Sequence, residues 1–221
     1  MTLNPVLRID TQMHWALAAH AKVDAQAARE RSLEVLRLVG IPSPEERLRA
    51  YPHELSGGMR QRIAIAIAML NKPDILIADE ATTALDVTIQ AQILSEMQNL
   101  CAATGTSLIW ITHDLSVVAG LADRVCVMYA GKIVEQGTVD EVLDSPMHHY
   151  TNGLIGSVPS MNARGEPLKQ IAGMTPSLFD LPSGCPFRTR CPAAIPDCSS
   201  SIPLLHQNAH QYRCINPPVS V

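Results

Sequence analysis

Two apolar runs in the sequence each end in side chains that can do chemistry. Residues 75–78 (Ile-Leu-Ile-Ala) are followed at once by Asp79 and Glu80, and residues 107–112 are followed by His113. One carboxylate at the end of a buried strand can hold a hydrated Mg²⁺, and a second can polarise an attacking water. The alternative is structural, because an acidic pair can cap the following turn and a lone histidine at a strand end often only packs.

A candidate anion site begins at Ser56, where Gly57 and Gly58 open a predicted helix that continues through Gln61. The free amide groups at a helix start and the positive end of its dipole attract a phosphate. The glycines would also let a phosphate approach the backbone, and Ser56 could add a hydroxyl donor. A serine N-cap with glycines for a tight turn is the structural alternative, and it is the better one for a bare Ser-Gly-Gly.

The elements that must position these residues alternate between helix and strand, which indicates an α/β architecture. The two apolar runs are typical of parallel strands that are covered on both faces. Helices are predicted within 10–39, over 56–70, over 87–103 and around 115–121, strands over 75–78 and 107–112, and a hairpin over 125–129 and 132–136.

Four motifs in a fixed order make the sequence resemble the ATPase subunits of ABC transporters. Residues 55–59 (Leu-Ser-Gly-Gly-Met) resemble the signature motif, 75–80 the Walker B motif, 84–86 (Ala-Leu-Asp) the D-loop and 111–114 (Ile-Thr-His-Asp) the H-loop. The resemblance implies the C-terminal portion of a P-loop NTPase nucleotide-binding domain of the ABC type, with its helical subdomain.

The same resemblance implies a role for individual residues, with ATP and Mg²⁺ as the bound groups. Glu80 and His113 would be catalytic, and Asp79 would hold Mg²⁺. The signature loop would contact the γ-phosphate of ATP on an opposing subunit. Asp86 could also cap the helix that begins at Val87. The nucleotide-binding residues would be Ser56, Gly57, Gly58, Gln61 and Asp86.

Further strings make the chain resemble the ATPases of dipeptide and oligopeptide importers. The similarity implies a second ATPase subunit and integral membrane permease subunits as partners, and a cytoplasmic position, peripheral on the inner face of the cell membrane. Ala81 departs from the proline usual after the Walker B acids, which should alter local stiffness more than chemistry. The strings are Asn4-Pro5, Tyr51-Pro52-His53, 82–88 (Thr-Thr-Ala-Leu-Asp-Val-Thr) and 129–132 (Tyr-Ala-Gly-Lys).

Beyond about residue 145 prolines become frequent and the periodicity of apolar residues disappears. This loop-rich extension is therefore expected to need a cross-link, such as a bound metal or disulfides, to fold. Clustered thiols in a reducing compartment indicate metal before disulfides. Thiolates select Zn²⁺ or an iron–sulfur cluster. The family resemblance favours a [4Fe-4S] cluster, and zinc and a metal-free tail remain alternatives. The four candidate ligands are Cys185, Cys191, Cys198 and Cys214.

The remaining cysteines and the nearby histidines have no predicted role in chemistry. Cys101 and Cys126 lie in apolar surroundings and are predicted to be core thiols. His206 and His210 lie near the cysteine cluster on a polar loop, and they are expected to be solvated.

No P-loop motif is present, because none of the 12 glycines begins the pattern Gly-x₄-Gly-Lys-Ser/Thr. The expected organisation is a helical subdomain over 1–70, an α/β core portion over 71–144 and the cysteine extension over 145–221. Without a P-loop strand, strands 75–78 and 107–112 would leave apolar faces and edges exposed. The chain is therefore expected to be a truncated product or one part of an ATPase completed by a separate N-terminal half, and inactive alone.

Composition excludes other classes of function. The formal net charge is −4, so no basic field exists to bind nucleic acid, and the longest apolar run, 63–70, is too short for a bilayer span. A DNA-repair ATPase of the ABC type would also need a coiled-coil insertion. The competing hypothesis is a catalytically inactive fragment or accessory module that contributes only the signature surface and the cysteine tail.

Overall fold

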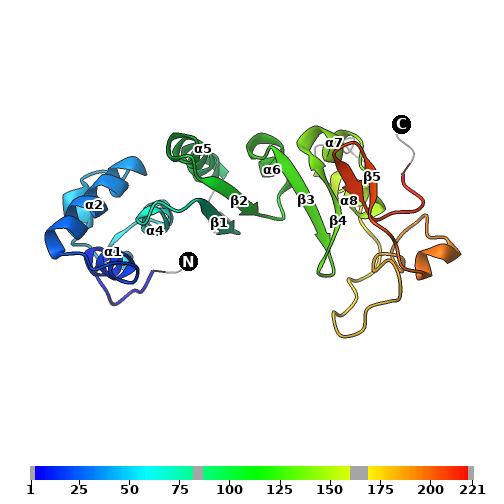
Figure 1. The fold of residues 1–221 in the computed structure, drawn as a ribbon, viewed down its shortest axis with the longest axis horizontal. Coiled ribbons are helices and arrows are strands. Elements are labelled where there is room, and N and C mark those ends of the chain that lie inside the picture. The colour runs from blue at the N-terminus through cyan, green and yellow to red at the C-terminus, as the bar shows by residue number, and fades with distance from the viewer. Residues whose placement is uncertain (1–2, 82–86, 160–168, 219–221) are drawn as a thin grey trace. The chain divides into compact units, whose positions relative to one another are not determined.

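The computed structural model of the chain describes residues 3–81, 87–159 and 169–218 (Figure 1). The chain forms two compact units, Met1–His113 and Asp114–Val221, called here the N-terminal and C-terminal units. In the described part of the chain, no helix combines the length and apolar character that a membrane crossing requires.

The N-terminal unit begins with a group of helices. The predicted helical stretch over 10–39 is two helices, because Asp24 starts a new one. The carboxylate of Asp24 accepts hydrogen bonds from the backbone N–H groups of Gln26 and Ala27, both at 2.9 Å. The helical elements are α1 (Ile9–Ala18), α2 (Ala25–Leu38), α3 (Pro44–Arg47), the 3₁₀ turn η1 (Pro52–Glu54) and α4 (Gly57–Met69).

The helix α4 is fixed at its C-terminal end by Arg31 of α2. The Arg31 guanidinium donates to the backbone carbonyls of Leu70 at 2.9 Å and of Met69 at 3.0 Å. These carbonyls end a helix and have no partner within it. The cap therefore joins α2 to α4 through charge-assisted hydrogen bonds.

Two parallel strands complete this unit, β1 (Ile75–Asp79) and β2 (Ser107–Ile111), with α5 (Val87–Thr104) between them in sequence (Figure 1). Leu76 and Ala78 are buried on one face of the sheet. The opposite face carries four isoleucines that are 48–63% exposed. The prediction of an exposed apolar face is confirmed, and the expectation of strands covered on both faces is wrong for the described residues. The exposed residues are Ile75, Ile77, Ile109 and Ile111.

The C-terminal unit contains a four-stranded antiparallel sheet in the order β3-β4-β6-β5. The predicted hairpin is confirmed, and Ala130 and Gly131 turn it with φ values of 47° and 76°. The two last strands come from the cysteine extension and were not predicted. The elements are α6 (Leu115–Leu121), β3 (Arg124–Tyr129), β4 (Lys132–Thr138), α7 (Val139–Asp144), α8 (His149–Gly156), the 3₁₀ turn η3 (Pro196–Ser199), β5 (Leu205–Gln207) and β6 (His210–Tyr212).

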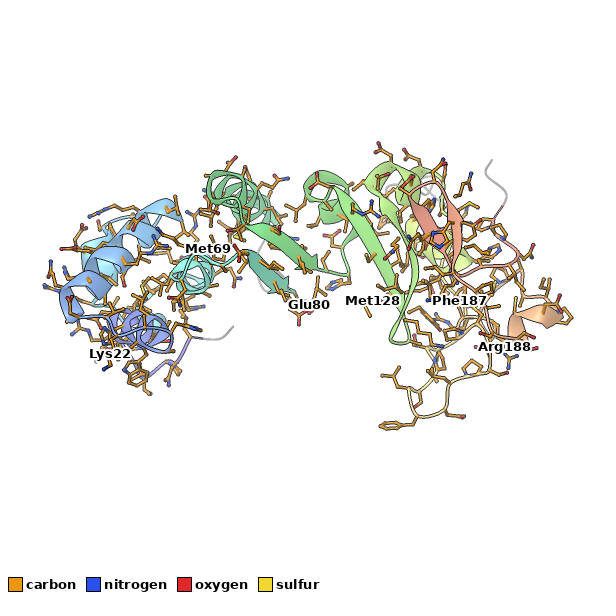
Figure 2. The ribbon with its side chains drawn as sticks, in the orientation of Figure 1. Lys22, Met69, Glu80, Met128, Phe187 and Arg188 are labelled. Carbon is orange, nitrogen blue, oxygen red and sulfur yellow. The ribbon has the colours of Figure 1, made fainter. Side chains whose placement is uncertain are left out.

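Phe187 is the centre of the C-terminal core and is 1% exposed (Figure 2). Its ring contacts Tyr129 at 5.3 Å and Tyr150 at 5.4 Å between centroids. Burial of one aromatic side chain contributes roughly 1.5–3 kcal/mol. The cysteine extension therefore shares its core with the hairpin.

Two predictions for individual residues in this unit are wrong. Cys126 is exposed rather than part of a core, because its side chain points to the outward face of β3. His210 is buried rather than solvated, because it lies in β6 against Glu135 of β4. Cys101 is buried as predicted.

Candidate functional site

Glu80 lies at the carboxyl end of β1 (Figure 2). Its backbone N–H donates to the carbonyl of Ile111 at 3.0 Å, which ties it to the end of β2. Its φ of 46° is in the left-handed region, uncommon for a residue other than glycine. Such strain is found where the surroundings fix an unusual backbone, often at functional sites.

The structure brings Glu80 and His113 together. Nδ1 of His113 lies 3.3 Å from Oε1 of Glu80. Both side chains are exposed, so the pair is open to a ligand. The parallel pairing of β1 and β2 places both residues at the same edge of the sheet.

Ser56 acts as the N-cap of α4, because its hydroxyl accepts the backbone N–H of Met59 at 3.2 Å. Gly58 has a packing role as well, since a Cβ there would lie 3.2 Å from Cγ2 of Ile89 in α5. The structural alternative for this segment, a serine N-cap with closely packed glycines, is therefore observed. The start of α4 can still bind an anion, so the two interpretations are compatible.

A groove of about 660 Å³ in the N-terminal unit is lined by predicted site residues from both the Ser-Gly-Gly segment and the Asp79-Glu80 pair. Gly57 and Gln61 line it from α4, and Asp79 and Glu80 line it from β1. The rest of its wall is largely apolar, so the groove suits a polypeptide segment beside a polar ligand. Asp86 lies outside the described residues. The apolar lining residues include Leu3, Ala64, Ile65, Ala68, Ile77 and Trp110.

Arg62 was missed by the sequence reasoning, and it sets how the signature helix is held. Its guanidinium forms an ion pair with Glu96 of α5 at 2.7 Å and donates to the backbone carbonyls of Val39 at 3.4 Å and Gly40 at 3.3 Å. The available signal was its position directly before the apolar stretch of α4. Arg62 therefore joins α4 to both α2 and α5.

In the C-terminal unit the four predicted cysteines line one cavity of about 20 Å³. Three of the sulfurs accept a backbone N–H from the residue two positions later. Burial raises the pKa of Cys185 and Cys191, and it raises the pKa of Cys214 to about 11. The donors are Phe187 for Cys185, Ala193 for Cys191 and Asn216 for Cys214.

The donor set of this cavity fits a soft metal, because thiolates with N–H donors are ligands for zinc or iron. Within the described ranges, no group of three or more His, Cys, Asp or Glu side chains is arranged to hold a metal ion. The space available is about one water molecule in size. The chemistry of the ligands therefore fits, while the thiols would have to move to enclose a metal.

His148 also lines this cavity and was not singled out from the sequence. It caps α8, since its Nδ1 accepts the N–H of Tyr150 at 3.1 Å, and its Nε2 lies 3.9 Å from Sγ of Cys185. Burial lowers the pKa of His148 to about 4, which keeps the ring neutral. No sequence signal distinguishes it from the adjacent His149.

A buried carboxylate holds the chain at this point. Glu135 of β4 is 0% exposed, and its Oε1 accepts from the backbone N–H of Met147 at 2.6 Å and lies 2.7 Å from Nε2 of His210. Its Oε2 accepts the N–H of His148 at 3.0 Å. Glu135 therefore joins β6 to the start of α8.

Two family profiles match the sequence. The profile described as "ABC transporter" matches residues 2–83, and the profile described as "Oligopeptide/dipeptide transporter, C-terminal region" matches residues 134–198. The two matched ranges include most of the residues that line the groove of the N-terminal unit and most of the cysteine extension.

Curated relatives are similar over almost the whole chain. The dipeptide transport ATP-binding protein DppD of Bacillus subtilis (strain 168) is 52% identical over 214 residues, which are 96% of this chain and 64% of that protein. The oligopeptide transport ATP-binding protein OppD of Escherichia coli (strain K12) is 46% identical over 218 residues, 99% of this chain and 65% of that protein. The chain thus spans just under two thirds of the length of these relatives.

Solved structures give the same picture of the fold. The dimeric structure of MJ0796, a bacterial ABC transporter cassette, has a TM-score of 0.53 at 27% identity. The aligned region covers 62% of this chain and 59% of the MJ0796 chain. A post-hydrolysis state of the same cassette, bound to ADP and Pi, has a TM-score of 0.52 at the same identity and coverage.

Proposed function

Because the chain belongs to the ABC transporter family of ATP-binding proteins, in the group with the oligopeptide/dipeptide transporter C-terminal region, we propose that it is an ATP-hydrolysing subunit, or part of one, that energises peptide import. The observation that carries this proposal is the contact between Glu80 and His113 at the shared edge of β1 and β2. In this proposal Glu80 would be the general base and His113 its orienting partner.

In the proposed mechanism Glu80 polarises a water that attacks the γ-phosphate of ATP in line with the leaving group. His113 contacts the carboxylate of Glu80 and would also contact the same phosphate. Asp79 would hold Mg²⁺ through water, and the ion would neutralise charge on the phosphates. The start of α4, with Ser56, Gly57, Gly58 and Gln61, would bind ATP on the opposing subunit.

A P-loop-bearing segment would complete the nucleotide site. The exposed isoleucine face of β1 and β2 and the apolar wall of the groove support this, because both are surfaces that a neighbouring strand and its helix would cover. The occupant we propose is the N-terminal half of an ABC nucleotide-binding domain, whether it belongs to this chain or to a separate one.

The partners we propose follow from the relatives, which are named as transport ATP-binding proteins. A second ATPase subunit would supply the opposing half of each site, and membrane permease subunits would receive the helical part of the N-terminal unit. This arrangement would place the protein on the inner face of the cell membrane.

We further propose that the four-cysteine cavity holds a soft metal centre, a [4Fe-4S] cluster by family resemblance or zinc as the alternative. The converging thiols and their N–H donors support it. Such a centre would add to the stability of this loop-rich segment, which has few regular elements of its own. Iron and sulfide analysis of anaerobically purified protein, with its ultraviolet–visible spectrum, tests the cluster, and a colourless, iron-free protein refutes it.

Supplying an N-terminal half tests the proposed function. The mixture of a P-loop-bearing half and this chain is expected to hydrolyse ATP, while each part alone is not. A folded, associated mixture without hydrolysis would favour the alternative, an accessory module that contributes only its signature surface and cysteine tail.

A further inference from the structure

His148 directs a polar ring atom at one of the four sulfurs. Nδ1 accepts the N–H of Tyr150 at 3.1 Å, so the ring hydrogen is on Nε2. Nε2 lies 3.9 Å from Sγ of Cys185, within the range of a hydrogen bond to sulfur. The ring therefore presents a donor to the thiol of Cys185.

We propose that His148 is a positioning residue of the four-cysteine site, which donates Nε2–H to the sulfur of Cys185 and orients it toward a bound soft metal. This inference rests on the metal site proposed above, and it adds a residue that is not itself a ligand.

The main chain of His148 is fixed independently of its ring. Oε2 of Glu135 accepts its N–H at 3.0 Å, and Oε1 accepts the N–H of Met147 at 2.6 Å. Glu135 is fully buried, so water does not compete for these bonds. Backbone and ring are thus held from two sides, which leaves the Nε2–H direction well defined.

Phe187 brings a second donor to the same sulfur. Its ring packs against His148 with centroids 5.9 Å apart, and its backbone N–H donates to Sγ of Cys185. The backbone N–H of Arg188 donates to the main-chain carbonyl oxygen of Cys185 at 3.1 Å. The sulfur of Cys185 therefore receives an imidazole N–H in addition to the amide donor of Phe187.

Hydrogen bonds to a ligating sulfur orient it and stabilise its negative charge. Loss of such an outer partner typically lowers metal affinity about 10- to 100-fold. The same loss is expected here if the imidazole acts on Cys185, regardless of whether the resident metal is zinc or iron.

The test measures Cd²⁺ affinity of the full chain from the thiolate-to-cadmium charge-transfer band. All proteins carry Cys126→Ser, because that thiol is exposed. In His148→Asn the shorter side chain can still cap α8 but cannot reach the sulfur. His148→Phe loses both functions. His206→Asn, an exposed histidine of β5, is the matched control.

Both His148 variants are expected to bind Cd²⁺ about 10- to 100-fold more weakly, with His206→Asn unchanged. In the metal-free form only His148→Phe should melt at a lower temperature. Wild-type affinity in His148→Asn would overturn the proposal and leave His148 as a helix cap alone. A wild-type chain that binds no Cd²⁺ through these thiols would refute the site and this role together, without bearing on ATP hydrolysis.

Discussion

Nδ1 of His113 lies 3.3 Å from Oε1 of Glu80, although 33 residues separate them in sequence. The contact follows from the parallel pairing of β1 and β2, since carboxyl ends of neighbouring parallel strands meet at one edge. The parallel strand pairing thereby brings together the proposed base and its proposed orienting partner.

Glu80→Gln should lower ATP hydrolysis by the completed enzyme about 100-fold or more, because the amide cannot act as a base. ATP binding should persist. His113→Ala should lower hydrolysis at least about tenfold, since it removes the Glu80 contact and the proposed phosphate contact. Steady-state phosphate release and equilibrium ATP binding are the measurements. Full activity in Glu80→Gln would remove the carboxylate from the mechanism.

Much of the N-terminal unit could be predicted because its signals are local. The Ser-Gly-Gly start of α4 and the apolar runs of β1 and β2 lie where the sequence indicates them. The fold class, an ABC-type α/β cassette, is confirmed by the matched family and by the solved cassettes. The order of the motifs was enough to predict this fold class, because each motif is a contiguous run of residues.

Contacts between distant segments could not be predicted. His210 and Glu135 are 75 residues apart, and only the folded sheet, in which β6 pairs with β4, makes one the partner of the other. A buried histidine and a solvated one look alike in sequence. The exposure of Cys126 is missed for the same reason, because it depends on which segments cover the residue.

Replacing Ile77 and Ile109 together with lysine should abolish completion of the enzyme by a P-loop-bearing half. Burying two ammonium groups against a second segment is unfavourable by several kcal/mol, on the order of the desolvation cost of an ion. Leu38→Lys, at an α2 residue as exposed as Ile109, is the control and should associate normally. Co-purification of the two halves is the measurement, and wild-type association of the double variant would show that this face is not covered.

Gly184→Ala should disrupt the loops that carry the cysteines. Its φ is 73°, and a Cβ would lie 2.3 Å from the carbonyl oxygen of Cys198, which also accepts the N–H of Cys185. Gly173→Ala has a similar φ of 74° but only an ordinary contact, so it should cost the strain alone, about 1–2 kcal/mol.

Denaturant unfolding and a count of reactive thiols compare these two variants. A larger loss of stability in Gly184→Ala, with more of the cysteines reactive, is the expected result. Equal stability of the two alanine variants would contradict the close approach of the two cysteine loops.

Glu135→Gln should destabilise the C-terminal unit by about 1–3 kcal/mol. The carboxylate accepts on both oxygens, and the amide would direct an NH₂ group at a donor already in place. Asp140→Asn, an exposed residue of α7, should change stability by less than about 0.5 kcal/mol. The denaturant midpoint is the measurement, and an unchanged midpoint in Glu135→Gln would show that the buried carboxylate does not hold β6 and α8 together.

The most direct measurement is ATP hydrolysis by this chain combined with an N-terminal half that carries a P-loop, with the Glu80→Gln chain in parallel. We predict phosphate release only from the combination and its loss with Glu80→Gln. An associated, folded combination that binds ATP and releases no phosphate, or one whose activity survives Glu80→Gln, would contradict the account.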